Sequence, residues 1–551
     1  MPRKKKGLAL TAAAVLLTSM LSGCGGSDEP SGNEPKPTDS GAQGSSATPN
    51  AGAAYTLPLV KDGTGSLTVG VPDNRYAPKS YTQNLPVWQE IEKRTGVKIN
   101  WDVTPVAQYN QAMNVRLAAA SGLPDILQLP GSPVNYGTDG IIKPLNDLID
   151  KYAPNIKKYF ADNPKIANLH KAPDGKIYAL SADISGTATT DPLGWLIRKD
   201  WLDKLGLKEP TTLDEWYTVL KAFKEKDPNG NGKQDEIPLS NQYTWGGLAL
   251  FGNALGLHLG EYSYGYSVDA NGKIKNDWLD PKAKELIVWL NKLYTDGLLD
   301  PEFMSKKTDK ILADITREVV GATNNLLNAT QKFNAAINKP GVNWVMTVPP
   351  ANGTNKPFYE KAAPISGYWA ISKDAKNPEL AIKWLDYIYA SEEGQRFVAY
   401  GIEGTSYKMV NGKPVFTDYV LNNPDKLDAV SALRTLGAFP NTPWIRAEKG
   451  PLSGQPEALL QPNPQLLEQA KRIEPYLVDN TPLKYILPTP EEADEEKRLS
   501  ADINTYQEET LLKFIYGKEP IDWDKFTKRM KELGNDELTA IKQKQYDRVK
   551  K

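Results

Sequence analysis

The chain of 551 residues contains one cysteine, Cys24, which stands at the end of an N-terminal signal segment. Four cations at residues 3–6 precede an uncharged, largely apolar stretch from Gly7 to Leu21. This is the layout of a secretory signal peptide, and the stretch is too short and too weakly apolar to span a bilayer. Because one cysteine forms no internal disulfide, burial of apolar side chains, with or without a bound metal, has to stabilise the fold.

The end of the signal segment, Leu21-Ser-Gly-Cys24, resembles the lipobox of bacterial lipoproteins. The resemblance implies that residues 1–23 are removed and that Cys24 carries the lipid, including a palmitate-like chain. The alternative is an ordinary signal peptide with an incidental cysteine. Residues 25–54 contain no Leu, Ile, Val or aromatic residue, so 24–54 is predicted to be a lipidated, disordered tether. The predicted location is therefore the extracytoplasmic face of the cell membrane.

From Tyr55 onward, the hydrophobic pattern alternates between strands and helices. Ser66–Val71 predicts a buried strand, Asn84–Thr95 a helix ended by a glycine, and Val97–Thr104 a strand with alternating apolar and polar residues. Asp125–Leu129 predicts the next strand. Such a run is typical of parallel α/β layers, and a second run begins at Gly194–Arg198.

Composition excludes some classes of function and leaves others open. With 66 Lys and Arg against 67 Asp and Glu, nothing favours binding to nucleic acid. The sequence lacks a Gly-x-Ser-x-Gly elbow, a His-Glu-x-x-His motif and a phosphate-binding loop, and its two histidines, His170 and His258, lie far apart. A glycosidase needs only two carboxylates a few ångström apart, so that class of enzyme remains an alternative.

The segment 227–238 matches the first half of an EF-hand loop. It has oxygen side chains at loop positions 1, 3 and 5, glycine at 6 and a backbone carbonyl at 7. Pro238 stands at position 12, where an EF-hand has glutamate, and acids occupy positions 9 and 10 instead. The alternative is a solvated turn without metal. The predicted ligands of a structural Ca²⁺ ion are Asp227, Asn229, Asn231, the Lys233 carbonyl, Asp235 and Glu236.

Three parts of the chain together resemble a known family. They are Trp195–Glu215 with the calcium-type loop that follows, Gly367–Ile382, and C-terminal motifs such as Phe514–Gly517. They are similar to family 1 extracellular solute-binding lipoproteins of ABC importers, in the long Gram-positive form related to alginate oligosaccharide-binding proteins. The resemblance implies an α/β, two-lobed, periplasmic-binding-protein-like (type II) fold with an interlobe cleft and a hinge.

The same resemblance implies how the chain is divided. Residues 55–190 are expected to form the first part of lobe 1, and 191–362 lobe 2 with the calcium loop 227–236. Residues 363–420 are expected to return to lobe 1. The helical C-terminal part, 421–551, is assigned mainly to lobe 2 and to interlobe packing.

The implied function is a lipid-anchored, non-enzymatic and monomeric receptor that delivers an oligosaccharide to an ABC permease. Sugar sites pair aromatic platforms with a few polar groups. The segment Ser240–Gly247 resembles the part of maltose-type binding proteins where a strand end presents aromatic residues. The expected ligand contacts are Tyr243, Trp245, Trp444, Gln128 and Trp369, for the last of which core and cleft positions are both open. The alternatives are a receptor for a peptide or another solute, a lipoprotein glycoside hydrolase, and a surface adhesin.

Overall fold

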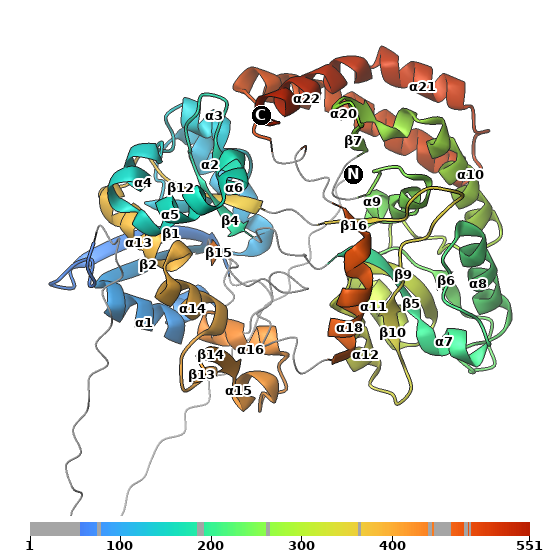
Figure 1. Ribbon diagram of the computed structural model, residues 1–551, viewed down its shortest axis with the longest axis horizontal. Helices are drawn as coiled ribbons and strands as arrows, with labels where there is room; N and C mark the ends of the chain where they lie inside the picture. Colours follow the sequence, from blue (N-terminus) through green and yellow to red (C-terminus); the bar gives the residue numbers. More distant parts are fainter. Residues whose placement is uncertain are drawn as a thin grey trace, which may run out of the picture. The chain divides into compact units, whose positions relative to one another are not determined.

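Two β-sheets, each with its own hydrophobic core, carry the fold (Figure 1). The computed structural model describes residues 55–73, 79–184, 192–260, 265–361, 365–438, 444–445, 464–478, 483 and 486–550. All of them belong to one compact unit of the chain, residues 52–551. The signal segment, Cys24 and the tether lie outside the described residues.

The first sheet has six strands in the order β15-β4-β12-β3-β1-β2. Strands β1, β2 and β3 are parallel, whereas β12 runs antiparallel to both β3 and β4. The sheet is thus mixed, although the sequence predicted parallel layers, because a strand from much later in the chain inserts between β3 and β4. The strands are β1 (Gly65–Pro72), β2 (Val97–Thr104), β3 (Ile126–Leu129), β4 (Leu180–Ile184), β12 (Ile365–Ile371) and β15 (Trp444–Ile445).

Helices from both parts of the chain pack around this sheet (Figure 1). Helix α1 contacts β2, and α13 contacts both β12 and α5. The helices are α1 (Pro86–Thr95), α2 (Val106–Ala119), α3 (Pro133–Thr138), α4 (Asn146–Tyr152), α5 (Pro154–Asp162), α6 (Pro164–His170), α13 (Pro378–Ala390), α14 (Glu392–Tyr400), α15 (Asp418–Leu421) and α16 (Ala429–Leu436).

The second sheet has four strands in the order β10-β5-β9-β6. Strand β6 is parallel to β9, and β5 is antiparallel to both β9 and β10. The strands are β5 (Leu193–Arg198), β6 (Ile237–Leu239), β9 (Val320–Leu326) and β10 (Trp344–Met346). Its helices are α7 (Lys199–Lys204), α8 (Leu213–Glu225), α9 (Thr244–Leu248), α10 (Pro281–Thr295), α11 (Thr308–Thr316), α12 (Ala329–Ile337), α18 (Pro464–Ile473), α20 (Pro490–Ile515), α21 (Trp523–Glu532) and α22 (Asn535–Val549).

Three two-stranded ribbons complete the described strands. They are β7 with β8 (Tyr266–Val268 and Ile274–Asn276), β11 with β16 (Tyr359–Glu360 and Leu477–Val478) and β13 with β14 (Tyr407–Val410 and Lys413–Phe416). The turn of the last ribbon is Asn411-Gly412, with φ of 51° and 76°. Positive φ at both central residues is what a type I′ hairpin turn requires.

The chain passes from one sheet to the other more than once. Residues 65–184 and 365–445 supply the strands of the first sheet, and 193–346 supply those of the second. Helices α18, α20, α21 and α22 then pack in the core of the second sheet. Helix α16 and strand β15 pack in the core of the first sheet, although they lie in the stretch 421–551 that the sequence assigned mainly to lobe 2.

Strand β10 is an edge strand, and side chains accept the outward-facing N–H groups along it. Its alternate residues bond to β5, which leaves the N–H groups of Trp344, Met346 and Val348 facing away from the sheet. These groups donate to Asn334 Oδ1 (2.9 Å), Gln469 Oε1 (2.8 Å) and Glu209 Oε1 (3.1 Å). The side chain of Arg472 donates to the Met346 carbonyl and, at 2.7 Å, to Glu209.

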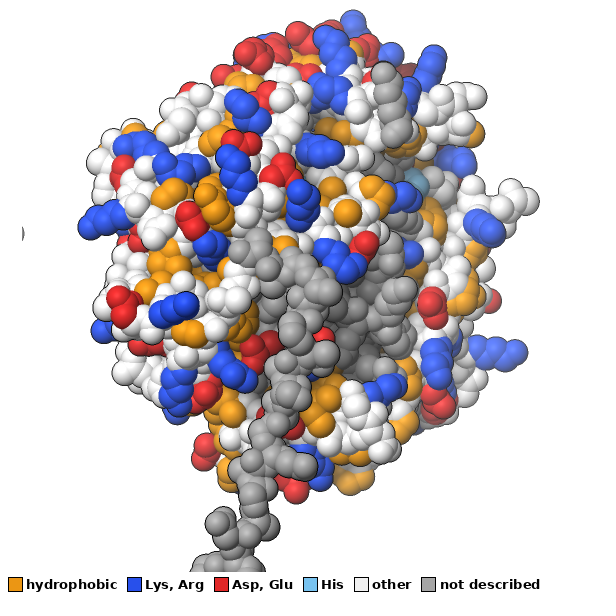
Figure 2. Space-filling view, turned by 60° about the vertical axis from the view of Figure 1, so that its left-hand side comes forward, with side chains coloured by type: hydrophobic (Ala, Val, Ile, Leu, Met, Phe, Trp, Pro, Cys, Tyr) orange, Lys and Arg blue, Asp and Glu red, His pale blue; other side chains and the backbone are white. Residues whose placement is uncertain are grey.

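The surface mixes charges of both signs. Figure 2 shows Lys and Arg side chains interspersed with Asp and Glu across the face it presents. This agrees with the formal net charge of −1. Among the described residues, no helix is long and apolar enough to cross a membrane.

Candidate functional site

The loop from Asp227 to Glu236 connects α8 to β6 and is folded around one carboxylate. Asp227 Oδ1 accepts the N–H groups of Gly230 (2.9 Å) and Asn231 (3.1 Å), and its Oδ2 accepts that of Gly232 (3.0 Å). Gly230 and Gly232 have φ of 73° and 75°, a region that glycine adopts without strain. The spacing of this motif therefore produces a tight loop that is closed around the Asp227 carboxylate.

Two further predicted ligands, Asn229 and Asn231, contact Asp235. The amide groups of Asn229 and Asn231 donate to Asp235 Oδ1 at 3.2 and 3.0 Å. The Oε1 atom of Glu236 is buried and has no hydrogen-bond partner. Burial, and then the nearby charges of Asp227 and Asp235, raise the pKa of Glu236.

A buried carboxylate oxygen without a partner, set beside two further acids, is the environment that a bound cation relieves. Within the described residues, no group of three or more His, Cys, Asp or Glu side chains lies close enough to form a metal site by itself. The three carboxylates of the predicted set, Asp227, Asp235 and Glu236, therefore do not form such a group, and the other half of the set consists of amide and backbone oxygens. Hard oxygen donors with three carboxylates fit Ca²⁺ chemically.

A second cluster lies where the parallel strands β6 and β9 reach their carboxyl ends. Ligands of open α/β sheets bind outside this end of the strands. Asn324, fully buried on β9, accepts through Oδ1 the N–H groups of Gln242 (3.0 Å) and Tyr243 (3.1 Å). Its Nδ2 donates to Asn241 Oδ1 at 2.5 Å, and Asn241 Nδ2 donates to the Phe303 carbonyl at 3.1 Å. Asn324 thus fixes the segment that carries the predicted aromatic residues.

The two aromatic residues of this segment are half-buried against the core of the second sheet. The ring of Trp245 stacks on that of Trp278, with centroids 5.1 Å apart and planes 28° apart. Gly247 lets helix α9 pack directly against Asn241 and Asn324. A Cβ atom at this position would lie 2.5 Å from both Asn241 Oδ1 and Asn324 Nδ2. We call residues 240–247 with Asn324 and Asn325 the amide–aromatic cluster.

The other predicted contact residues belong to the first sheet. Gln128 lies at the end of β3, is half-buried, and has a buried Oε1 atom without a hydrogen-bond partner. Trp369 is its direct neighbour on β12 and has no exposed surface, which places it in the core, one of the two positions left open by the sequence. Trp444 is in β15, where its backbone pairs with that of Asp183 in β4. The side chain of Trp444 lies outside the described part of the structure.

The sequence did not single out Asn241 or Asn324. Asn324 belongs to Thr323-Asn-Asn-Leu at the end of a strand, and adjacent amides in that position were the available signal. The contact with Asn241 joins residues 83 positions apart, which no local pattern reveals.

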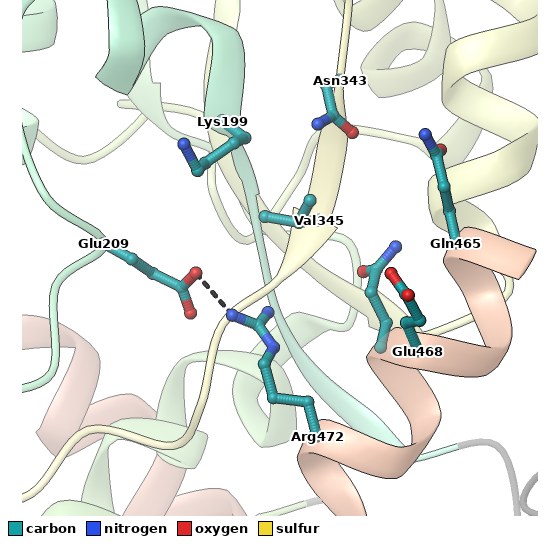
Figure 3. Close-up of a pocket in the computed structure, with 8 residues that line it drawn as sticks. Lys199, Glu209, Asn343, Val345, Gln465, Glu468 and Arg472 are labelled. Atoms are coloured by element: carbon teal, nitrogen blue, oxygen red, sulfur yellow. Dashed lines mark hydrogen bonds and ion pairs between the residues drawn. The ribbon is translucent and has the colours of Figure 1, made fainter.

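A polar pocket of about 290 Å³ lies beside edge strand β10 and was also not expected from the sequence. Figure 3 shows Glu209 and Arg472 meeting across it, with Lys199 and Glu468 among the other lining residues. Charged groups and amides form its wall with one apolar side chain, Val345. Its chemistry therefore differs from that of the amide–aromatic cluster.

The two-lobed fold is that of solute-binding proteins, and comparison with known proteins identifies the family. Residues 45–395 match the family model described as bacterial extracellular solute-binding protein. The match covers more than half of the chain, and the chain belongs to this family.

Three relatives illustrate the similarity. The fructooligosaccharide ABC transporter substrate-binding protein FusA of Streptococcus pneumoniae serotype 4 is 28% identical over 508 residues, which cover 86% of this chain and 88% of FusA. Lipoprotein LipO of Bacillus subtilis is 27% identical over 375 residues, 64% of this chain and 69% of LipO. The crystal structure of the alginate-binding protein AlgQ2 without calcium ion is 27% identical with a TM-score of 0.70, covering 90% of this chain and 99% of AlgQ2.

Proposed function

We propose that this chain captures an oligosaccharide outside the cytoplasm and delivers it unchanged to an ABC permease. The observation that carries the proposal is the amide–aromatic cluster at the carboxyl ends of β6 and β9, in a member of the solute-binding family. Sugars combine apolar C–H faces with hydroxyl groups, so aromatic rings and amides match both parts of their surface. The names of FusA and AlgQ2 as binding proteins for such glycans support the same class of ligand.

In this proposal, Tyr243 and Trp245 of the second lobe contact the sugar rings. Gln128 at the end of β3 and Trp444 in β15 contribute from the first lobe. The two lobes close on the ligand by a hinge motion, and contacts made only in the closed state supply the affinity. Trp369 has a packing role in the core of the first sheet.

Thermal unfolding of a soluble chain beginning near Tyr55, against a panel of glycans, tests the proposal. A ligand at about 100 times its dissociation constant adds about 2.7 kcal/mol of stability. We expect a shift with one glycan class and recovery of that glycan intact. Cleavage of the glycan would favour the glycoside hydrolase, and shifts only with peptides or other solutes would favour a different receptor.

We further infer that the loop 227–236 holds a structural Ca²⁺ ion. Its ligands are Asp227, Asn229, Asn231, the Lys233 carbonyl, Asp235 and Glu236. The ion would offset the charge of the three carboxylates and pin the loop between α8 and β6. The partnerless Oε1 of Glu236 supports this assignment.

Removing calcium is expected to lower stability. With Ca²⁺ at about ten times its dissociation constant, binding contributes about 1.4 kcal/mol, which chelation removes. The substitution Asp235→Asn is expected to abolish the response to Ca²⁺ in thermal unfolding. Asp269→Asn is the matched control, because Asp269 caps a similar turn through the N–H groups of Asn271 and Lys273 at 2.8 Å. Equal unfolding temperatures with calcium and with chelator would contradict the inference.

We also propose that Cys24 is lipidated and that the lipid holds the protein at the membrane. The anchored protein is proposed to be a monomer. The lipobox resemblance and the relative named lipoprotein LipO support this. Labelling of the expressed full chain with a fatty-acid analogue, with Cys24→Ala as the control, tests the anchor.

A further inference from the structure

Strand β6 leaves its sheet at the start of the amide–aromatic cluster, and one side chain continues the pairing. The Ser240 N–H still donates to the Ala322 carbonyl of β9 at 2.9 Å. The ladder of a parallel pair would next join the Gln242 N–H to the backbone carbonyl of Asn324. Instead, the N–H groups of Gln242 (3.0 Å) and Tyr243 (3.1 Å) both donate to the side-chain Oδ1 of Asn324. An amide side chain therefore replaces the backbone acceptor just before helix α9 begins.

The orientation of the Asn324 amide is fixed by a second amide. Because its Oδ1 accepts both N–H groups, its Nδ2 faces an acceptor, Asn241 Oδ1, at 2.5 Å. Asn241 Nδ2 in turn donates to the Phe303 carbonyl at 3.1 Å. Asn324 has no exposed surface, and Asn241 is also buried. Asn324 is therefore held in one orientation and lies out of reach of a ligand.

Helix α9 packs against this pair of amides. Its Gly247 N–H donates to the Tyr243 carbonyl at 2.6 Å, and a Cβ atom at Gly247 would lie 2.5 Å from both amides. Trp245 lies in the same turn and stacks on Trp278. Tyr243 and Trp245 are thus positioned at one end by the N–H groups that Asn324 accepts, and at the other by the contact of the helix with the amide pair.

This arrangement bears on affinity, because a segment that is already ordered loses less conformational entropy when a ligand binds. Backbone N–H groups are strong donors that need a partner wherever water is excluded. Without the acceptor of Asn324, the N–H groups of Gln242 and Tyr243 would turn toward water, and the segment would adopt further conformations. Binding would then have to select one conformation from several, which lowers the observed affinity.

We propose that Asn324 is a positioning residue of the glycan site. It raises the affinity by holding Gln242 and Tyr243 in the binding geometry before the ligand arrives. This inference rests on the proposed function and deepens it, because Asn324 acts on the ligand only through the residues that it holds. The expected signature is a loss of affinity larger than a general loss of stability produces.

Calorimetric titration of the soluble chain tests the inference, with a panel from fructo- and malto-oligosaccharides to oligogalacturonates and alginate oligomers as probes. Asn324→Ala is expected to weaken binding of the bound glycan at least about tenfold. Asn253→Ala is the matched control, because Asn253 is also fully buried and donates to the Phe358 carbonyl at 2.9 Å. Both variants are expected to unfold at a lower temperature, but only Asn324→Ala should lose affinity. Equal affinities of the two variants would overturn the inference.

The conservative variant Asn324→Asp separates positioning from packing. A carboxylate also accepts both backbone N–H groups, and N–H donors of this kind stabilise a buried carboxylate. Asn324→Asp is therefore expected to bind the glycan within about threefold of the unaltered protein, which is about 0.7 kcal/mol. An affinity as low as that of Asn324→Ala would contradict a role for the accepted N–H groups.

Hydrogen exchange in the protein without glycan measures the positioning directly. Residues 240–247 are expected to exchange faster in Asn324→Ala than in the unaltered protein, and to keep their protection in Asn324→Asp and Asn253→Ala. Unchanged exchange in Asn324→Ala would overturn the inference and leave the oligosaccharide receptor intact. If no glycan of the panel binds the unaltered protein, the proposed function fails and this inference fails with it.

Discussion

Replacing Trp245 with alanine is expected to weaken oligosaccharide binding at least about 30-fold, a loss of about 2 kcal/mol or more. An indole that stacks on a sugar ring buries a large contact area, and truncation to alanine removes that area. The stack of Trp245 on Trp278 holds the ring in a fixed orientation before the ligand arrives, so little side-chain entropy remains to be lost on binding.

The control for this experiment is Trp289→Ala. Trp289 lies on α10, is also half-buried against the same core, and packs edge-on against Phe251 with centroids 4.6 Å apart. Both variants are therefore expected to lose a similar amount of stability in denaturant unfolding. Calorimetric titration with the glycan separates them, since only Trp245→Ala should lose affinity. Equal affinities in the two variants would show that Trp245 has a packing role.

Acidification is expected to destabilise the protein through His170, by about 3 kcal/mol between pH 6.5 and pH 4. The histidine is fully buried on α6. The Ser181 N–H donates to its Nε2 at 3.0 Å, so Nδ1 carries the proton and donates to the Ile166 carbonyl at 2.8 Å. Burial lowers the pKa of His170 from 6.5 to about 4.

The direction of the effect follows from proton counting. Between pH 4 and pH 6.5 the unfolded chain binds a proton at this histidine and the folded chain does not, so stability is present above pH 6.5 and is lost as the pH falls. Denaturant unfolding at several pH values measures it, with His170→Gln as the non-titrating comparison. Parallel pH dependence in the two proteins would contradict the prediction.

Local chemistry explains what the sequence predicted well. Helix α1 ends at Gly96 with φ of 67°, as the glycine after Thr95 indicated. The loop 227–236 could be proposed as a calcium site for the same reason, because its predicted donors lie within ten consecutive residues. These features depend on neighbours in the chain, which a single sequence displays.

Long-range pairing explains what it missed. The insertion of β12 between β3 and β4 depends on strands that are hundreds of residues apart, and their order leaves no local trace. The position of Trp369 stayed open because a strand buried on both faces shows no alternating pattern. The sequence pointed to the aromatic residues Tyr243 and Trp245 of the cluster. It did not point to Asn324, which accepts the Tyr243 N–H and lies on strand β9.

The side chains that cover the edge of β10 affect how copies of the protein can pair with one another. An open strand edge invites pairing between molecules wherever copies of a protein meet at high local concentration. Here Asn334, Gln469 and Glu209 occupy the three outward N–H groups that a neighbouring strand would need. These side chains therefore oppose strand pairing through this edge.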